Sequence, residues 1–486
     1  MAQTNRTWIF IAALASAFMT AVEATIVATA MPTIVGALGG FELLSWVFTA
    51  YLLAQTVTIP IYGRLADLYG RKPILLVGIA IFVLGSVLCG FAWGMPSLIA
   101  CRALQGLGAG AVMPVSRTLI GDVYRGAERA RMQGYVSSVF VSSAVLGPML
   151  GAFLAAHTIW SMVFWINVPV GLAAAVLLLW KLDEVVERRP HRIDYTGSAL
   201  LAAGSGLLMF VLAEATRLSL GMGSALTAAA TMLLALFAFW EGQVREPIWP
   251  PALLRDRIVA SGNIVSLALG AMTMGFAAFL PAYIQGVMGR TALVAGAIVT
   301  AMSATAPVGA VLGGRIMLRS SFRAAATAGA VISIAGSLLL LRVAPDGGLL
   351  LLLIGGPLLG FGMGMNNNTY MVAIQSIGGW NVRGAGTATI IFTRILGQAM
   401  GAALFGGIVN ALLAHEAGGA DMATRMLDPG LRHALPAAEF QALIGAFDQA
   451  VHIIFLTILG FALLVLVIGF LLPDGVGLRQ EAGADD

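Results

Sequence analysis

The chain is a succession of long apolar runs separated by short polar connectors. An α-helix needs about 20 residues to cross a hydrocarbon layer about 30 Å thick, and fourteen runs come close to or exceed that length. The runs are continuously apolar, whereas the strands of a membrane barrel alternate, so the pattern favours helices. We therefore predict an all-α membrane protein with spans near residues 8–34, 43–66, 73–92, 96–121, 132–156, 160–181, 196–216, 224–241, 259–286, 292–317, 324–342, 348–373, 385–413 and 449–473.

The predicted spans fall into groups of six, two and six. A charged connector, KLDEVVERRPHRIDY, starts at Lys181, and a second one, REPIWPPALLRDR, starts at Arg245. The six-span blocks each carry a Gly-Arg near the end of their second span, which suggests an internal repeat of the kind found in carriers. The expected domains are an N-terminal six-helix bundle at 1–182, a linker with two additional transmembrane helices at 183–254, and a C-terminal six-helix bundle with a short cytoplasmic tail at 255–486.

The composition excludes a soluble domain. Hydrophobic residues make up 59% of the 486 positions and charged residues 10%, against about 45–50% and about 25% in ordinary soluble domains. The two cysteines, Cys89 and Cys101, lie inside apolar runs and are too few for a disulfide framework or a zinc site. We expect no metal and no cofactor. The first run is too long for the core of a signal peptide, so we interpret it as an uncleaved span.

Most Lys and Arg residues lie in every second connector along the chain. The net charge of +4 could indicate a nucleic-acid partner, but short cytoplasmic loops of membrane proteins are enriched in Lys and Arg, and this explains the charge better. Alternate connectors and both ends hold Arg6, Arg64, Arg71, Lys72, Arg117, Arg125, Arg129, Arg131, Lys181, Arg188, Arg189, Arg192, Arg245, Arg255, Arg257, Arg315, Arg319, Arg323, Arg383 and Arg479. The opposite set holds only Arg217, Arg290, Arg342, Arg425 and Arg432. Both termini are therefore expected in the cytoplasm, and only Arg102 and Arg394 fall inside spans.

The connector after the second span, GRLADLYGRKP, starts at Gly63 and packs one acid and three bases between two apolar helices. Gly63 and Gly70 let helix ends approach closely, and Asp67 can accept from a neighbouring helix N-terminus. Arg71 and Lys72 suit the headgroup level, so we expect a gate on the cytoplasmic side. This segment resembles the signature loop of the major facilitator superfamily. Within that superfamily the chain is most similar to the fourteen-span drug:proton antiporter group. The resemblance implies a major facilitator fold of two six-helix bundles plus two extra transmembrane helices.

Two charged residues inside spans lie on further segments that resemble this group. In the first span, VEATIVATAMPTI has Glu23 where the group often has an aspartate. In the fourth span, LIACRALQGLGAG is similar to the proton-linked motif, with Arg102 as the matched arginine and Gln105 about one turn away. The resemblance implies that Glu23 and Arg102 take part in proton coupling.

The fifth span resembles the antiporter motif in the segment VLGPMLGA, which contains Gly147, Pro148 and Gly151. Two glycines of the family pattern are replaced by Ser143 and Ala152. Both substitutes are small, so close helix packing remains possible.

A charge at the centre of a span costs at least about 2.5–3.5 kcal/mol, so Glu23 is interpreted as functional. The alternative is a structural, hydrogen-bonded acid. Arg102 is either a clamp that donates to backbone carbonyls or a charge partner for a carboxylate in one conformation only. We expect Glu23 to share a water-accessible centre with the opposite half of the bundle.

Candidate residues for a substrate cavity come from both halves. They are Trp46, Tyr51, Gln55, Tyr283, Gln285, Asn366, Asn367, Tyr370, Arg394 and Gln398. Packing is the alternative interpretation for the aromatic residues. Arg394 either packs or binds an anion. The three consecutive amides at 366–368 cannot share one helix face, so we expect one to face the cavity and another to pack between helices.

The predicted function is secondary active transport: a monomeric, multi-pass, proton-coupled antiporter of a bacterial inner membrane. It would export small amphipathic or apolar compounds by alternating access, with protons, substrate and lipid as its partners. One alternative is export of a specific metabolite, lipid or organic anion by the same fold. Another is a membrane sensor or assembly subunit that transports nothing. We find no Walker loop, HExxH motif or Gly-x-Ser-x-Gly elbow in the required context, so we expect an ion gradient as the energy source and no enzyme activity.

Overall fold

The computed structural model describes residues 3–124, 126–182, 184, 194–215, 217–244, 247–249, 251–376, 380–414, 419–427 and 436–472. Within these residues the regular structure is entirely helical, and fourteen helices are long and apolar enough to cross a membrane. The predicted all-α fold with fourteen spans is confirmed.

The first six spans are built from seven α-helices, because the sixth span is interrupted near Ile166. They are α1 (Gln3–Leu38), α2 (Leu44–Tyr69), α3 (Arg71–Gly90), α4 (Met95–Val123), α5 (Gly126–His157), α6 (Met162–Trp165) and α7 (Asn167–Lys181), with the short η1 (Phe41–Leu43) before α2. The two additional spans are α8 (Tyr195–Glu214) and α9 (Leu220–Glu241).

The last six spans follow the short α10 (Pro251–Leu254). They are α11 (Arg257–Ala282) continued by η2 (Tyr283–Val287), then α12 (Ala292–Arg319), α13 (Phe322–Leu340), α14 (Leu349–Gln375), α15 (Trp380–Leu413) and α17 (Ala437–Gly469), with the short α16 (Gly419–Leu427) before α17. Helix α17 begins at Ala437, well before the predicted start near 449. Its early turns also bury apolar side chains, Leu443 and Phe447 among them, so packing extends the helix beyond its most apolar stretch.

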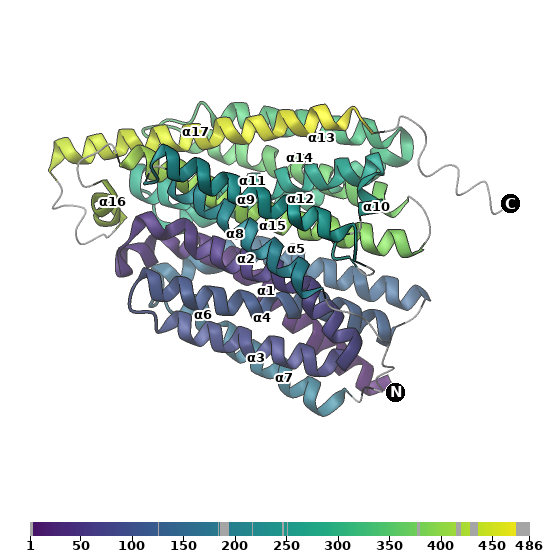
Figure 1. Ribbon diagram of the computed structural model, residues 1–486. Helices are drawn as coiled ribbons and strands as arrows, with labels where there is room; N and C mark the ends of the chain where they lie inside the picture. Colours follow the sequence, from purple (N-terminus) through teal and green to yellow (C-terminus); the bar gives the residue numbers. More distant parts are fainter. Residues whose placement is uncertain are drawn as a thin grey trace.

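Each six-span half has the same internal arrangement. In the first half α1 packs on α5, and α4 packs on both α2 and α3. In the second half α11 packs on α15, and α14 packs on both α12 and α13. Figure 1 shows the halves as two stacked layers, the first in purple and blue and the second in green and yellow. The neighbours repeat in the same order, as an internal repeat requires.

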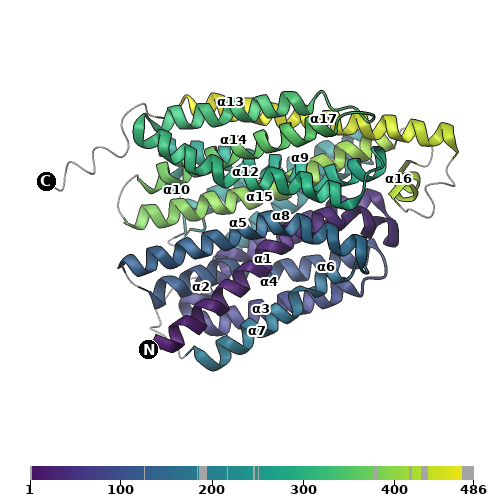
Figure 2. The ribbon, with the colours of Figure 1, turned by 180° about the vertical axis from the view of Figure 1, so that it is seen from behind.

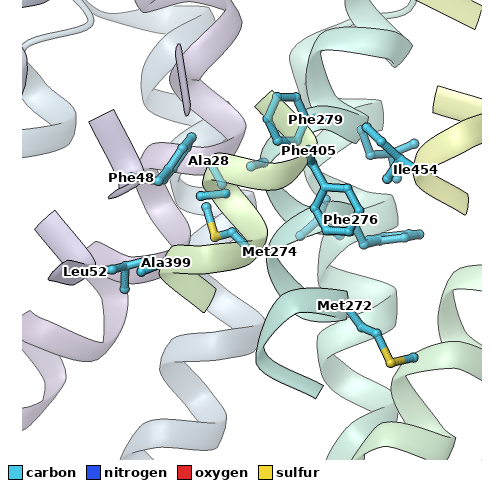
Figure 3. Packing of buried hydrophobic residues seen from close by; sticks show 14 of the residues in the cluster. Ala28, Phe48, Leu52, Met272, Met274, Phe276, Phe279, Ala399, Phe405 and Ile454 are labelled. Carbon is cyan, nitrogen blue, oxygen red and sulfur yellow. The ribbon is translucent and has the colours of Figure 1, made fainter. Parts of the chain in front are cut away.

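The halves meet along three pairs of helices: α1 with α11, α2 with α15, and α5 with α12. Figure 2 shows the α5 and α12 pair from behind. Figure 3 shows part of the packed centre, where Phe48 and Leu52 of α2 lie near Ala399 of α15, with Phe276 and Phe279 of α11 beyond it. Small residues at the contact bring the backbones close, which suits helix association in lipid.

The additional helices lie across one of these seams. Helix α8 packs against α9 on one side and against both α2 and α15 on the other, as Figure 1 shows. Helix α9 exposes large apolar side chains, including Met232 and Phe239, as expected of a helix that faces lipid.

The two ends of the bundle differ. The start of α1 and the end of α17 lie at one end, which we call the terminal end, and α16 lies at the opposite end, which we call the α16 end (Figures 1 and 2).

Candidate functional site

Glu23 and Arg102 form an ion pair inside the first half. The Glu23 carboxylate on α1 accepts a hydrogen bond from Nη1 of Arg102 on α4, and the two side chains are 0% and 1% exposed. The amide of Asn167, at the start of α7, donates to the second Glu23 oxygen at 2.5 Å. Each carboxylate oxygen therefore has a donor, which is what a charge needs when it is removed from water.

Arg102 is held by several further groups of the first half. Its Nη1 donates to Oε1 of Gln105 at 2.5 Å, and its Nε donates to the Val47 carbonyl at 3.3 Å. Its guanidinium lies over the ring of Tyr51, 4.1 Å from the centroid. Gln105 in turn donates to the hydroxyl of Ser86 on α3 at 2.8 Å. Arg102 is therefore both a charge partner of a carboxylate and a donor to a backbone carbonyl, which were the two alternatives drawn from the sequence.

The expectation that Glu23 shares a water-accessible centre with the second half is not met in this conformation. Its side chain is fully buried, and its hydrogen-bond partners, Arg102 and Asn167, both belong to the first half. The network joins α1, α4 and α7, and its ion pair seals the carboxylate from solvent. Proton exchange at Glu23 would require a conformation in which this pair opens.

The fifth span supports the Glu23 region by close packing. A Cβ on Gly147 would lie 2.0 Å from Oγ1 of Thr25, and one on Gly151 would lie 2.2 Å from the Ile26 carbonyl, both on α1. Thr29 also donates to the Pro148 carbonyl at 2.9 Å. The three residues of the predicted antiporter motif thus lie against the part of α1 that follows Glu23.

The same helix α5 also faces the second half. A Cβ on Gly296 of α12 would come within 2.6 Å of the Ala152 side chain and 2.9 Å of the Pro148 carbonyl. Thr300 of α12 donates to the Val145 carbonyl at 3.2 Å. A small residue at 152 fits this contact, which gives a structural reason why alanine can replace the glycine of the family pattern.

The charged connector between α2 and α3 braces the first half. Gly70 has φ 98°, a conformation that favours glycine, and it ends α2 and begins α3 in one residue. Asp67 pairs with Arg71 at 2.5 Å, and Arg71 also reaches Asp122 of α4 at 3.1 Å. Lys72 Nζ donates to the carbonyls of Leu179 and Leu182 at the end of α7. The described contacts of these side chains stay within the first half.

The acid that caps a helix N-terminus here is Glu184 rather than Asp67. The Glu184 carboxylate accepts from the backbone N–H groups of Arg71 and Lys72 at 2.7 and 2.8 Å. Anions are favourable at this position because the first N–H groups of a helix have no partner within it. Glu184 lies in the charged connector after the sixth span, where nothing in the sequence distinguishes it from the other acids of that connector.

The substrate-cavity candidates of the first half lie in different surroundings. Trp46 faces α8, where its indole donates to Glu214 at 3.1 Å and its ring lies 6.1 Å from Phe210. Tyr51 lies on Arg102 within the first half. Gln55 is buried at the α2–α4 contact, where Gly110 approaches its carbonyl.

The second-half candidates at the α16 end belong to η2. The Tyr283 hydroxyl donates to Asp448 of α17 at 2.5 Å, and its ring stacks on Phe447. Gln285 is half-buried two residues further on. Asp448 also lies 3.5 Å from His452. Tyr283 is therefore part of the contact between η2 and α17.

The amides at 366–368 divide as the helix geometry predicts. Asn366 is fully buried and packs toward Gly329 of α13, whereas Asn368 donates to the Ala310 carbonyl of α12 at 2.9 Å. Asn367 accepts from Nη1 of Arg394 at 3.1 Å. Asn366 and Asn368 thus pack between helices, and Asn367 contacts the guanidinium of Arg394.

Arg394 lies midway along α15 and is exposed, although its neighbours on the helix are mostly buried. The two other candidates nearby are less accessible. Gln398, one turn further along α15, is half-buried beside Gly270 of α11, and Tyr370 is buried against Gly262. Arg394 and Asn367 are thus the candidate pair that combines polarity with an exposed side chain.

The halves are joined at the α16 end. The backbone N–H of Phe41 donates to Thr424 of α16, and Asn410 of α15 donates to the Glu42 carbonyl at 2.8 Å. The Phe41 ring also contacts the ring of Phe447 on α17, with centroids 5.7 Å apart.

A cavity of about 370 Å³ lies between the halves toward the terminal end. The first half lines it with the end of α2, including Gly63, Asp67 and Ile59, and the second half with α15 from Ala385 to Phe392. The wall is completed by α8, the segment 247–249, Arg71 at the start of α3, and Pro114, Val115 and Thr118 of α4. The bundle is therefore closed at the α16 end and hollowed at the terminal end, and none of the ten predicted cavity residues lines this hollow.

Fourteen spans, two halves with the same internal arrangement and a cavity between them define a polytopic membrane transporter. The family model described as Major Facilitator Superfamily matches residues 13–402, and the chain belongs to this family.

Named relatives cover most of the chain. Multidrug resistance protein 3 of Bacillus subtilis (strain 168) is 31% identical over 474 residues, which cover 93% of this chain and 92% of the relative. Multidrug transporter protein MdtP of the same organism is 31% identical over 413 residues, covering 84% and 76%.

Solved structures share the fold. A bacterial homologue of the human lysosomal transporter Spinster, in an inward-facing and occupied conformation, aligns with a TM-score of 0.69 at 15% identity over 97% of each chain. A D-xylose-proton symporter aligns with a TM-score of 0.60 at 12% identity, over 90% of this chain and 99% of the symporter.

Proposed function

We propose that the protein is a proton-coupled antiporter that exports small amphipathic or apolar compounds by alternating access. The observation that carries this proposal is the Glu23–Arg102 pair, a carboxylate buried inside a span and held by an arginine and an amide. An ionisable group this deep in a transporter is functional by default. The relatives named for multidrug resistance and multidrug transport support the choice of substrates.

The orientation is part of the proposal. The terminal end carries Arg6, Arg71, Lys72 and Lys181, and basic residues are enriched on the cytoplasmic side of short connectors. The terminal end is therefore assigned to the cytoplasm of a bacterial inner membrane, and the cavity opens inward. In this state substrate would enter from the cytoplasm or the inner leaflet, while the α16 end closes the path outward.

In the proposed cycle, the Glu23 carboxylate pairs with Arg102 in one conformation and binds a proton in the other. When the α16 end opens, water reaches Glu23 and the carboxylate takes up a proton, which weakens its hold on Arg102. When the bundle returns to the inward-open state, the ion pair forms again and the proton leaves toward the terminal end. A monomer is sufficient for this cycle, because both halves are in one chain.

The purified protein in proteoliposomes provides the test. A panel of fluorescent cations, neutral amphiphiles and organic anions is loaded, and efflux is followed with a pH gradient and after an ionophore collapses it. The proposal predicts gradient-dependent efflux of amphipathic compounds. Efflux at the same rate with and without the gradient would contradict proton coupling. If no class of compound is exported, a sensor or assembly subunit would be favoured.

A second substrate class is favoured by one observation. Arg394 is exposed, and the partner described for its guanidinium is the neutral amide of Asn367. A cation in such a setting suits an anionic group on the substrate. Competition by organic anions that is lost in Arg394→Gln would support this class, whereas equal competition in both proteins would exclude it.

A further inference from the structure

Two acids lie where the additional helices meet at the terminal end. Asp194 immediately precedes α8, and Glu241 is the last residue of α9. The helices pack against each other and run in opposite directions, so these ends come together. One oxygen of Asp194 accepts from the backbone N–H of Gly197 at 2.8 Å and from the indole of Trp240 at 2.9 Å. One oxygen of Glu241 accepts from the backbone N–H of Trp249 at 2.6 Å.

The remaining oxygens of the two acids are buried without a hydrogen-bond partner. They are Oδ2 of Asp194 and Oε1 of Glu241, and the Glu241 side chain is only 2% exposed. Both oxygens border the same point, because a Cβ on Gly197 would lie 2.2 Å from the first and 3.0 Å from the second. Two ionised carboxylates placed this way would repel each other, and each would leave an acceptor unsatisfied.

One proton removes both problems, because a protonated carboxyl donates to the carboxylate beside it. We propose that Asp194 and Glu241 share a single proton, and that the pair is a proton site separate from Glu23. This inference concerns proton binding by the folded chain and does not depend on the proposed transport function.

Among the described residues, no cation donates a hydrogen bond to either of these two oxygens. Asp194 lines the cavity together with Arg64, Asp67 and Arg71, and the last two pair with each other. Arg394 lies on α15, which packs against α8, and contacts Asn367. His191, Arg192, Arg245 and Glu246, near the pair in sequence, lie outside the described residues, so the test must detect the proton itself.

The pair also adjoins a contact between the linker and the second half. Glu241 holds the backbone of Trp249, whose ring lies 6.0 Å from Phe392 of α15, and both aromatic residues line the cavity. A change in the protonation of the pair would therefore act on the wall between the additional helices and the second half.

Infrared difference spectra of the full-length purified protein, recorded between acidic and alkaline buffers, test the proposal. A protonated carboxyl has a carbonyl band that disappears on ionisation. Other acids titrate over this range too, and the pair predicts that one carboxyl band among them is lost equally in Glu241→Gln and in Asp194→Asn, since either amide can take the place of the protonated acid. The matched control is Glu214→Gln at the other end of α8, where Arg217 lies 3.2 Å from the carboxylate. That variant should keep the band.

A second measurement does not depend on the two acid variants folding. The indole of Trp240 donates to Asp194, so its fluorescence should change over the same pH interval, with Trp240→Phe providing the subtraction. If both acid variants retain the full titrating band, or if the Trp240 emission stays constant across that interval, the two acids do not share a proton and the proposal is overturned.

Discussion

At the residue scale, the central feature is a buried charge pair whose every oxygen has a donor. Removing two ions from water costs several kcal/mol each, and the cost is recovered only when geometry and hydrogen bonding are good. Asn167, Gln105 and the Val47 carbonyl supply these bonds around Glu23 and Arg102. The buried pair is stable while both partners are present, but an unpaired buried charge would strongly destabilise the fold. The Glu23 carboxylate can therefore leave Arg102 only when another partner, such as a proton, replaces it.

Arg102→Ala should therefore destabilise the protein by about 3–5 kcal/mol, because it leaves an uncompensated buried carboxylate. Glu23→Gln should cost less, since the amide oxygen can still accept from Arg102. The control is Arg217→Ala, which removes an exposed guanidinium from the more buried Glu214 carboxylate; Trp46 still donates to that carboxylate, so the cost should be about 1 kcal/mol or less. Thermal unfolding of the detergent-solubilised variants measures the order, and equal losses for Arg102→Ala and Arg217→Ala would contradict it.

The residues of this pair were selected from the sequence, but their surroundings were not. Glu23 and Arg102 could be chosen because charges inside spans are rare. Asn167 could not, because one amide near a span end has many possible neighbours, and its contact with Glu23 joins positions far apart in the sequence. Whether a side chain faces the cavity also depends on helix rotation, which is why Trp46 and Tyr283, both cavity candidates, lie against α8 and α17.

At the element scale, α5 is the helix that both α1 and α12 approach. On the α1 side the contact depends on positions where a side chain would strike backbone, since Gly151 lies against the Ile26 carbonyl. On the α12 side Gly296 meets Ala152 and the Pro148 carbonyl. In lipid, close backbone contact of this kind replaces the hydrophobic drive that joins helices in water.

Gly151→Ala should destabilise the protein by about 1–3 kcal/mol, because the new Cβ forces α1 and α5 apart. Gly134→Ala, in the same helix, meets nothing within 4 Å, and should leave stability unchanged or slightly raise it, since alanine favours helix. The measurement is the melting temperature of each variant. If Gly151→Ala is as stable as Gly134→Ala, the α1–α5 contact accommodates the added Cβ and the prediction is wrong.

The elements themselves were largely predictable, because apolar runs of spanning length have few alternatives in a membrane. All fourteen spans were found, and most of their ends lie within a few residues of the predicted ones, whereas α17 starts well before its predicted position. The break in the sixth span and the short α16 also escaped, since both depend on local packing rather than on an apolar run.

At the scale of the whole molecule, the halves touch at the α16 end and enclose a cavity toward the other end. Among the described residues, hydrogen bonds from the Phe41 N–H to Thr424 and from Asn410 to the Glu42 carbonyl cross the closed end. A two-state rocking motion requires such contacts to break and re-form, and the difference between the states must stay within a few kcal/mol.

A cross-link across the closed end should therefore stop transport. Cysteines at Phe41 and Thr424, joined by a short thiol reagent, would hold the α16 end shut, whereas Thr424→Cys alone retains the native cysteines and serves as the control. Efflux from proteoliposomes should fall to background in the cross-linked double variant and return on cleavage of the linker. Full transport by the cross-linked protein would show that this end does not open during the cycle.

The role of Glu23 in proton coupling is tested most directly by drug-stimulated proton movement in proteoliposomes that carry Glu23→Gln, compared with Glu214→Gln as a control acid outside the pair. We predict that Glu23→Gln still binds substrate but moves no protons in response to it, while Glu214→Gln couples as the wild-type protein does. Unchanged coupling in Glu23→Gln would contradict the proposed role of Glu23.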